Sequence, residues 1–147
     1  MSAGCVLVVD DEAPIRLLCR VNLEAEGLSV LEAGDGVTGL AVARAESPAA
    51  ILLDVMMPGG LDGWQVAEAL IDDERTAGIP IVFLTARGEL RDRARGLGVG
   101  GIDYVTKPFD PIELAAHVRA LLERVNEADR DELRREKLSE LRASLDG

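Results

Sequence analysis

The sequence predicts an α/β fold, namely a doubly wound, five-stranded parallel sheet with five helices and a C-terminal helical extension. Short, continuous apolar runs alternate with amphipathic segments along the first 125 residues. This alternation is typical of strands that are buried on both faces and joined by helices. Carboxylate, hydroxyl or lysine side chains follow several of the apolar runs. Right-handed crossovers between such strands place helices on both faces of a single sheet.

The expected elements alternate regularly from strand to helix. The strands are expected at residues 5–9, 28–33, 50–53, 80–84 and 102–106, and the helices at about 14–26, 37–45, 63–71, 89–97 and 111–125. Pro14 suits the first turn of a helix, and Gly27 suits its end. Asp62 is expected to cap the third helix. Asp110 and Glu113 form a capping-box pattern around Pro111 at the start of the fifth helix.

Composition excludes several classes of protein. The formal net charge of -11 argues against binding to a nucleic-acid backbone, because such proteins concentrate Lys and Arg on one face. No apolar run approaches the roughly 20 residues that span a membrane, and the N-terminus lacks the pattern of a signal peptide. Cys5 and Cys19 lie within apolar patterns, so we expect inert core thiols and a cytoplasmic location.

The last part of the chain differs in composition from the rest, so we divide the chain into residues 1–125 and a charged segment at 126–147. Helix-forming residues dominate this segment, which favours a helix over coil. Its apolar residues do not keep a clean heptad spacing. A helical extension or linker, a dimer seam and disorder all remain open. The large apolar residues of the segment are Leu133, Leu138, Leu141 and Leu145.

Five side chains are expected to converge at one edge of the sheet: Asp10, Asp11, Asp54, Thr85 and Lys107. Each follows or ends a predicted strand, and parallel strands bring their carboxyl ends together. Clustered carboxylates suit a hard divalent cation such as Mg²⁺. The lysine and the threonine are donors that can hold oxygens of a phosphoryl group placed on a central acid. The sequence therefore predicts a magnesium and phosphoryl site at this edge.

Four motifs in this order resemble those of the receiver domains of two-component response regulators, over about residues 5–125. The resemblance implies a flavodoxin-like fold and a signalling switch rather than an enzyme with an external substrate. The motifs are Val8-Val9-Asp10-Asp11-Glu12, Leu53-Asp54-Val55-Met56-Met57-Pro58 with Asp62-Gly63, Phe83-Leu84-Thr85-Ala86, and Asp103-Tyr104-Val105-Thr106-Lys107-Pro108-Phe109.

The resemblance implies that Asp54 accepts a phosphoryl group from a histidine kinase or a phosphotransfer protein, with Mg²⁺ as cofactor. Asp11 would bind the metal directly and Asp10 mainly through water. Asp54 and the backbone carbonyl of Met56 would complete the metal site. The phosphorylated carboxylate would then be the signal that the rest of the domain responds to.

The resemblance also implies how the phosphoryl group is read. Lys107 would pair with it, and Thr85 and Ala86 would contact it. The movement of Thr85 would let Tyr104 shift from an exposed to a buried rotamer, which is the family's switch. The peptide bond between Lys107 and Pro108 is expected to be cis. The loop from Pro58 to Gly63 is one residue longer than usual, so we expect it to sit differently.

Two other functions remain open. A Mg²⁺-dependent phosphohydrolase that works through an aspartyl phosphate has a similar acceptor, metal site and lysine. Such enzymes carry a second Asp as general acid two residues after the nucleophile, where this chain has Met56. A phosphorylation-independent interaction module is the second alternative, and the complete set of acids with Lys107 argues against it.

The sequence says less about binding partners than about the site. A homodimer is expected through the fourth helix, the fifth strand and the fifth helix, or through the C-terminal helix. We expect no direct binding of nucleic acid and no membrane contact. His117 and Trp64 are expected to be surface or packing residues. The residues expected near the dimer face are Arg91, Arg93, Asp103, Glu113 and Arg119.

Overall fold

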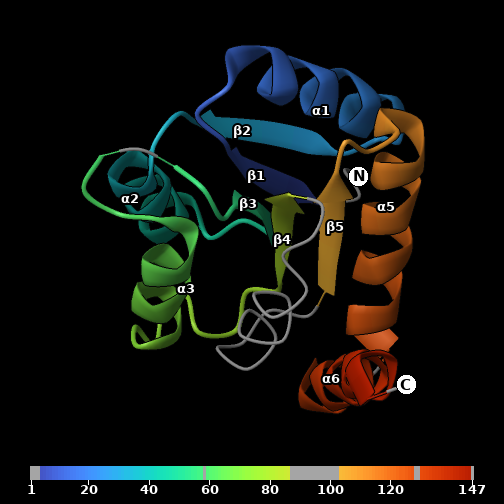
Figure 1. Cartoon of the computed structure of the whole chain (residues 1–147). Coiled ribbons are helices and arrows are strands. Elements are labelled where there is room, and N and C mark those ends of the chain that lie inside the picture. Colours follow the sequence, from blue (N-terminus) through green and yellow to red (C-terminus); the bar gives the residue numbers. More distant parts are fainter. Residues whose placement is uncertain (1–3, 58, 87–102, 128–129, 147) are drawn as a thin grey trace.

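The computed structural model describes residues 4–57, 59–86, 103–127 and 130–146 (Figure 1). The helix predicted at 89–97 lies outside these residues, as do Arg91 and Arg93 of the predicted dimer face. Among the described residues, no helix is long and apolar enough to cross a membrane.

Five parallel strands form one sheet in the order β2-β1-β3-β4-β5. This order confirms the predicted doubly wound sheet, because the chain starts in the middle and builds outward in both directions. The observed limits differ from the predicted ones by at most two residues. The strands are β1 (Cys5–Val9), β2 (Ser29–Ala33), β3 (Ala50–Asp54), β4 (Ile81–Ala86) and β5 (Asp103–Lys107).

Helices cover both faces of the sheet, with α1 and α5 on one side and α2 and α3 on the other (Figure 1). Asp62 accepts a hydrogen bond from the Gln65 main-chain nitrogen and completes a capping box. Asp110 accepts from the main-chain nitrogen of Ile112 at 2.9 Å, as expected for a cap. The described helices are α1 (Ala13–Ala25), α2 (Gly36–Glu46), α3 (Gly63–Ile71), α5 (Pro111–Glu127) and α6 (Arg130–Asp146).

Alternating strand residues build two cores, one on each face of the sheet. Val8 and Leu52 pack with α1 and α5 residues in the first core. Trp64 lies in the second core, with its ring centroid 4.8 Å from that of Phe83, which confirms its predicted packing role. Cys19 is buried as predicted, and burial raises the pKa of its thiol to about 12. Strands covered on both faces explain the continuous apolar runs in the sequence.

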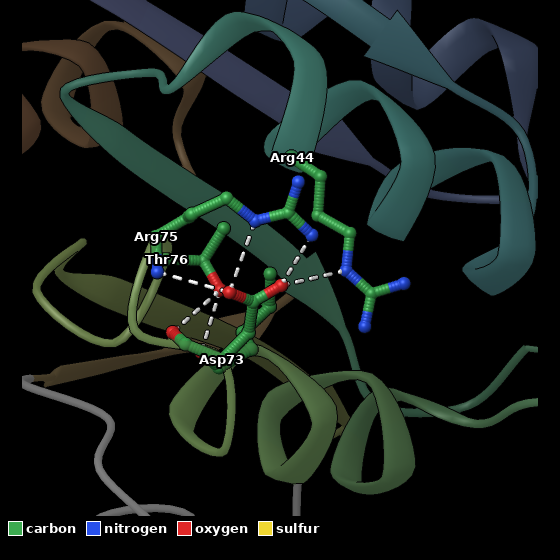
Figure 2. Close-up of polar contacts among 5 residues, drawn as sticks. Arg44, Asp73, Arg75 and Thr76 are labelled. Atoms are coloured by element: carbon green, nitrogen blue, oxygen red, sulfur yellow. Dashed lines mark hydrogen bonds and ion pairs between the residues drawn. The ribbon is translucent and has the colours of Figure 1, made fainter.

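Asp73, which follows α3, links the end of that helix to α2 through Arg44 (Figure 2). Its carboxylate accepts from Arg75 at 2.9 Å and from Arg44 of α2 at 3.1 Å. The Thr76 hydroxyl donates to the Leu70 carbonyl at 2.6 Å and closes the same turn. Hydrogen bonds from Arg75 lower the pKa of Asp73 to about 2. This cluster fixes the turn that leads into β4.

The C-terminal segment forms a helix, α6, beside the carboxyl end of α5 (Figure 1). Its Lys137 lies 3.6 Å from Asp103 at the start of β5. Asp103 also accepts from His117 of α5 at 2.8 Å and from the Tyr104 main-chain nitrogen at 2.8 Å. Helix α5 runs two residues past the predicted boundary at 125, to Glu127.

Asp103 is only 5% exposed, so this member of the set expected near the dimer face is largely covered within its own chain. Its carboxylate is covered because three elements of its own chain meet there. Burial alone would raise the pKa of Asp103, but the hydrogen bonds from His117 and Tyr104 and the charge of Lys137 outweigh it and lower the pKa. Asp103 is therefore an internal anchor for α5 and α6.

Replacing Lys137 with Gln is expected to loosen α6. The replacement removes a partly buried ion pair with Asp103, and such pairs contribute about 1 kcal/mol or less. A helix of this length is marginal on its own, so weaker docking exposes its amides. We expect amide hydrogen exchange in α6 to become up to about fivefold faster, as measured by mass spectrometry. Arg142→Gln, a charge loss at an exposed position of the same helix, is the control and should leave exchange unchanged. Equal exchange in wild type and K137Q would contradict the prediction.

Candidate functional site

The carboxyl ends of the strands bring the predicted side chains together. Asp54 ends β3, and Asp10 follows β1 directly. Thr85 lies in β4, opposite Thr106 of β5, and Lys107 is the last residue of β5. Asp10, Asp54 and Thr85 are each at most 4% exposed. The site is thus a set of buried polar groups at one edge of an apolar sheet.

Lys107 forms ion pairs with the buried acids, and Asp10 is its closest partner. Its ammonium nitrogen lies 2.8 Å from Oδ2 of Asp10 and 3.5 Å from Oδ1 of Asp54. Burial alone would lower the pKa of Lys107, but the hydrogen bond to Asp10 and the charges of both acids outweigh it and raise the pKa. Lys107 therefore stays charged and partly neutralises the two buried carboxylates.

The surroundings of Asp54 strongly perturb its protonation. Burial first, and then the charge of Asp10, raise the pKa of Asp54 from 3.8 to about 7. Lys107 and the Met56 main-chain nitrogen, 3.3 Å from Oδ1, oppose this shift without cancelling it. In the absence of a bound cation the ionised carboxylate is therefore costly, and a divalent cation would favour it.

Asp10, Asp11 and Glu12 offer carboxylate oxygens that lie within 4.8 Å of one another. Clustered hard oxygen ligands with excess negative charge fit Mg²⁺, which takes one or two carboxylates and keeps several waters. Of the carboxylates, the sequence prediction assigned Asp10, Asp11 and Asp54 to the metal, and not Glu12. The side chain of Glu12 is exposed and lies 4.0 Å from Lys107. The roles of the individual acids stay predictions.

The other predicted site residues lie around Asp54. The Met56 side chain is 65% exposed, directly after β3. Tyr104 is partly buried against the second core, opposite Phe83 of β4. Ala86 ends β4 beside Lys107. The peptide bond between Lys107 and Pro108 is cis, as predicted.

The longer loop after β3 closes onto the strand at Gly63. The Gly63 main-chain nitrogen donates to the Val55 carbonyl at 2.9 Å. Gly59 has a φ of 99°, in the left-handed region that favours glycine. The loop therefore turns within residues 59–62 and returns to the end of β3, where α3 begins.

Sequence reasoning missed two polar contacts that support this edge and the start of β5. Arg16 of α1 donates to the main-chain carbonyl of Asp10 at 2.7 Å. His117 was expected to be a surface or packing residue, and it is 41% exposed, but it also binds Asp103. No sequence pattern marks either contact, because the partners are on different elements whose relative placement comes from packing.

Comparison with known proteins identifies the family. A family model for the response regulator receiver domain matches residues 6–119. The DNA-binding dual master transcriptional regulator RpaA of Synechocystis sp. is 46% identical over 121 residues, which are 82% of this chain and 50% of that protein. The phosphate regulon transcriptional regulatory protein PhoB of Pseudomonas aeruginosa is 46% identical over 129 residues, 88% of this chain and 56% of that protein. The chain thus spans about half the length of the curated relatives it matches.

Solved structures agree with this match. A putative response regulator from Chloroflexus aurantiacus has a TM-score of 0.76 at 31% identity, covering 82% of this chain and 98% of that one. The receiver domain of the Francisella response regulator 1452 has a TM-score of 0.75 at 31% identity, covering 83% and 98%. The chain belongs to the response regulator receiver domains, which are signalling modules rather than conventional enzymes.

Proposed function

We propose that this chain is a phosphorylation-activated switch that accepts a phosphoryl group on Asp54 from a histidine kinase or phosphotransfer protein, in a Mg²⁺-dependent manner. The observation that carries the proposal is the placement of Asp54 at a strand end, 3.5 Å from Lys107 and beside the acidic cluster. A buried carboxylate with a cation on one side and a metal-binding set on the other suits an acceptor.

The transfer step needs an ionised Asp54. One carboxylate oxygen forms a bond to phosphorus as the phosphorus–nitrogen bond of a phosphohistidine breaks, and the imidazole keeps the electron pair and takes up a proton. Mg²⁺ held by Asp10, Asp11, Asp54 and the Met56 carbonyl would supply positive charge for the phosphoryl oxygens. Lys107 pairs with Asp10 before transfer, and the new phosphoryl charge would draw it toward Asp54.

Phosphorylation of Asp54 would be transmitted through changes in β4 and β5. Phosphorylation adds about -1.5 to -2 charges and three acceptor oxygens. Thr85 and the Ala86 main chain end β4 beside the acceptor and would contact these oxygens. Tyr104 lies on the neighbouring strand and is only partly buried, so it has room for a second rotamer that the inward movement of Thr85 would favour.

Localisation and partners follow from this role. We place the chain in the cytoplasm, where Cys5 and Cys19 stay reduced, in line with their free thiols here. A homodimer through the helix predicted at 89–97, β5 and α5, or through α6, remains part of the proposal. The printed names of RpaA and PhoB describe transcriptional regulators, and this chain would act on such an output only through a further segment or partner.

Incubation of the full chain with acetyl phosphate and Mg²⁺ is expected to add one phosphoryl group, as measured by intact mass. Asp54→Asn should take up none, because the amide is not a nucleophile. Asp62→Asn is the matched control, since this partly exposed helix cap lies outside the site and Asn caps a helix about as well as Asp.

Two results would contradict the proposal. Absence of phosphate uptake by wild type from acetyl phosphate or from a phosphorylated kinase would favour a phosphorylation-independent module. Sustained turnover of a phosphomonoester such as p-nitrophenyl phosphate would favour a phosphohydrolase. The exposed thioether of Met56, at the general-acid position of such enzymes, cannot donate the proton that turnover requires.

A further inference from the structure

The side chain of Arg16, which lies in α1, stabilises the turn between β1 and α1. The guanidinium nitrogen Nη1 donates to the main-chain carbonyl of Asp10 at 2.7 Å. The side chain is 21% exposed, so most of this charged group is covered by protein. A hydrogen bond from a charged donor is stronger than one between neutral groups. Arg16 therefore anchors the backbone of the turn that carries the acidic cluster.

Arg16 is itself fixed to the sheet by Glu32. Its Nε lies 3.2 Å from Oε1 of Glu32, which is in β2 and opposite Val8 of β1. The other Glu32 oxygen accepts from Arg20 at 2.6 Å. A planar guanidinium can bind a carboxylate and a carbonyl simultaneously through separate nitrogens, which an ammonium cannot do with the same geometry. Arg16 thus connects a strand residue to the turn.

The carbonyl that Arg16 holds belongs to the peptide bond between Asp10 and Asp11. Because a peptide unit is planar, fixing this carbonyl also fixes the position of the Asp11 Cα. The other polar groups of Asp10 are already occupied, since its carboxylate binds Lys107 and the Glu12 main-chain nitrogen, and its own nitrogen donates to Ala33. Asp11 is exposed, and its side chain interacts with that of Asp54, so the position of its backbone sets how its carboxylate meets the site.

We propose that Arg16 is a positioning residue for the metal-binding carboxylate of Asp11, acting through the Asp10 carbonyl without touching the metal. This inference deepens the proposed function and rests on its magnesium site. Residues that orient a metal ligand typically contribute 10- to 100-fold to metal affinity. Removing a cation near clustered acids would by itself strengthen Mg²⁺ binding, so positioning and charge predict opposite signs.

Titration of the full chain with Mg²⁺ by calorimetry tests this. Arg16→Gln is expected to raise the Mg²⁺ dissociation constant about tenfold. Arg20→Gln is the matched control, because it also removes one positive charge and one contact to Glu32 but none to Asp10. It should change the dissociation constant less than threefold. Arg16→Lys keeps the positive charge but lacks the several N–H donors of the planar guanidinium, so this variant should bind Mg²⁺ more weakly than wild type.

Urea unfolding without metal separates positioning from folding. If Arg16 positions Asp11, then R16Q and R20Q lose similar stability while only R16Q loses Mg²⁺ affinity. Mg²⁺ binding by R16Q as tight as by R20Q would overturn the inference, and so would a wild type that binds no Mg²⁺. A wild type that binds Mg²⁺ but takes up no phosphate would overturn the proposed function alone, because the titrations still decide the role of Arg16.

Discussion

Replacing Asp54 with Asn is expected to stabilise the metal-free chain on the order of 3 kcal/mol at pH 8, and by about 2 kcal/mol less at pH 5. Burial and the charge of Asp10 raise the pKa of Asp54 from 3.8 to about 7. Between these values the folded chain binds a proton that the unfolded chain has released. Protonation of Asp54 therefore stabilises the fold, and this contribution is lost as the pH rises through about 7. Asn carries no charge at either pH, so it removes the cost of the ionised carboxylate.

Urea unfolding in a chelator at the two pH values measures this effect through the fluorescence of Trp64, the single tryptophan. The matched control is Asp62→Asn, a partly exposed cap replaced by an equally good one, which should change the free energy of unfolding by a few tenths of a kcal/mol at both pH values. Added Mg²⁺ should narrow the gap between wild type and D54N, because a cation favours the ionised carboxylate. Equal stabilisation by D54N at pH 5 and pH 8 would show that the charge of Asp54 is not the cause.

Replacing Gly63 with Ala is expected to destabilise the chain by about 3 kcal/mol or more. An added Cβ would lie 2.7 Å from the Val55 Cα and would also contact the Asp54 carbonyl oxygen. Both neighbours are backbone atoms at the end of β3, so no side chain can rotate away. The start of α3 or the end of β3 must move, which also weakens the hydrogen bond from Gly63 to the Val55 carbonyl.

Gly60→Ala is the matched control in the same loop. An added Cβ at Gly60 has no neighbour within 4 Å, so we expect a change within about 0.5 kcal/mol. Urea unfolding of both variants, followed through Trp64, measures the difference. Similar stability of G63A and G60A would mean that the loop is free to move away from β3. Reduced phosphorylation of a folded G63A would show that the loop also sets the position of Asp54.

Local chemistry explains why much of the fold could be predicted from the sequence. A strand buried on both faces must be apolar throughout, so β1 and β3 are recognisable as continuous runs. Helix starts carry their own signals, and Asp62 and Asp110 cap α3 and α5 where the pattern predicts. The convergence of Asp54 with Lys107 follows from the same logic, because parallel strands share their carboxyl edge.

Contacts between distant elements could not be predicted in this way. The identity of the partner closest to Lys107, which is Asp10 rather than Asp54, depends on a difference of less than 1 Å between two distances, 2.8 Å to Asp10 and 3.5 Å to Asp54. The hydrogen bond from Arg16 to the Asp10 carbonyl depends on how α1 packs over β2. That packing is decided only by the contact with Glu32 and by the core.

The sequence by itself determined the parallel sheet, the helix caps and the set of residues at the edge, since each follows from residue type and spacing along one element. The tertiary structure alone decided that Asp103 anchors α5 and α6, because its partners His117 and Lys137 come from two helices that meet only after folding. It also decided that Gly63 closes the longer loop against β3, because backbone contact between two segments is invisible in either one.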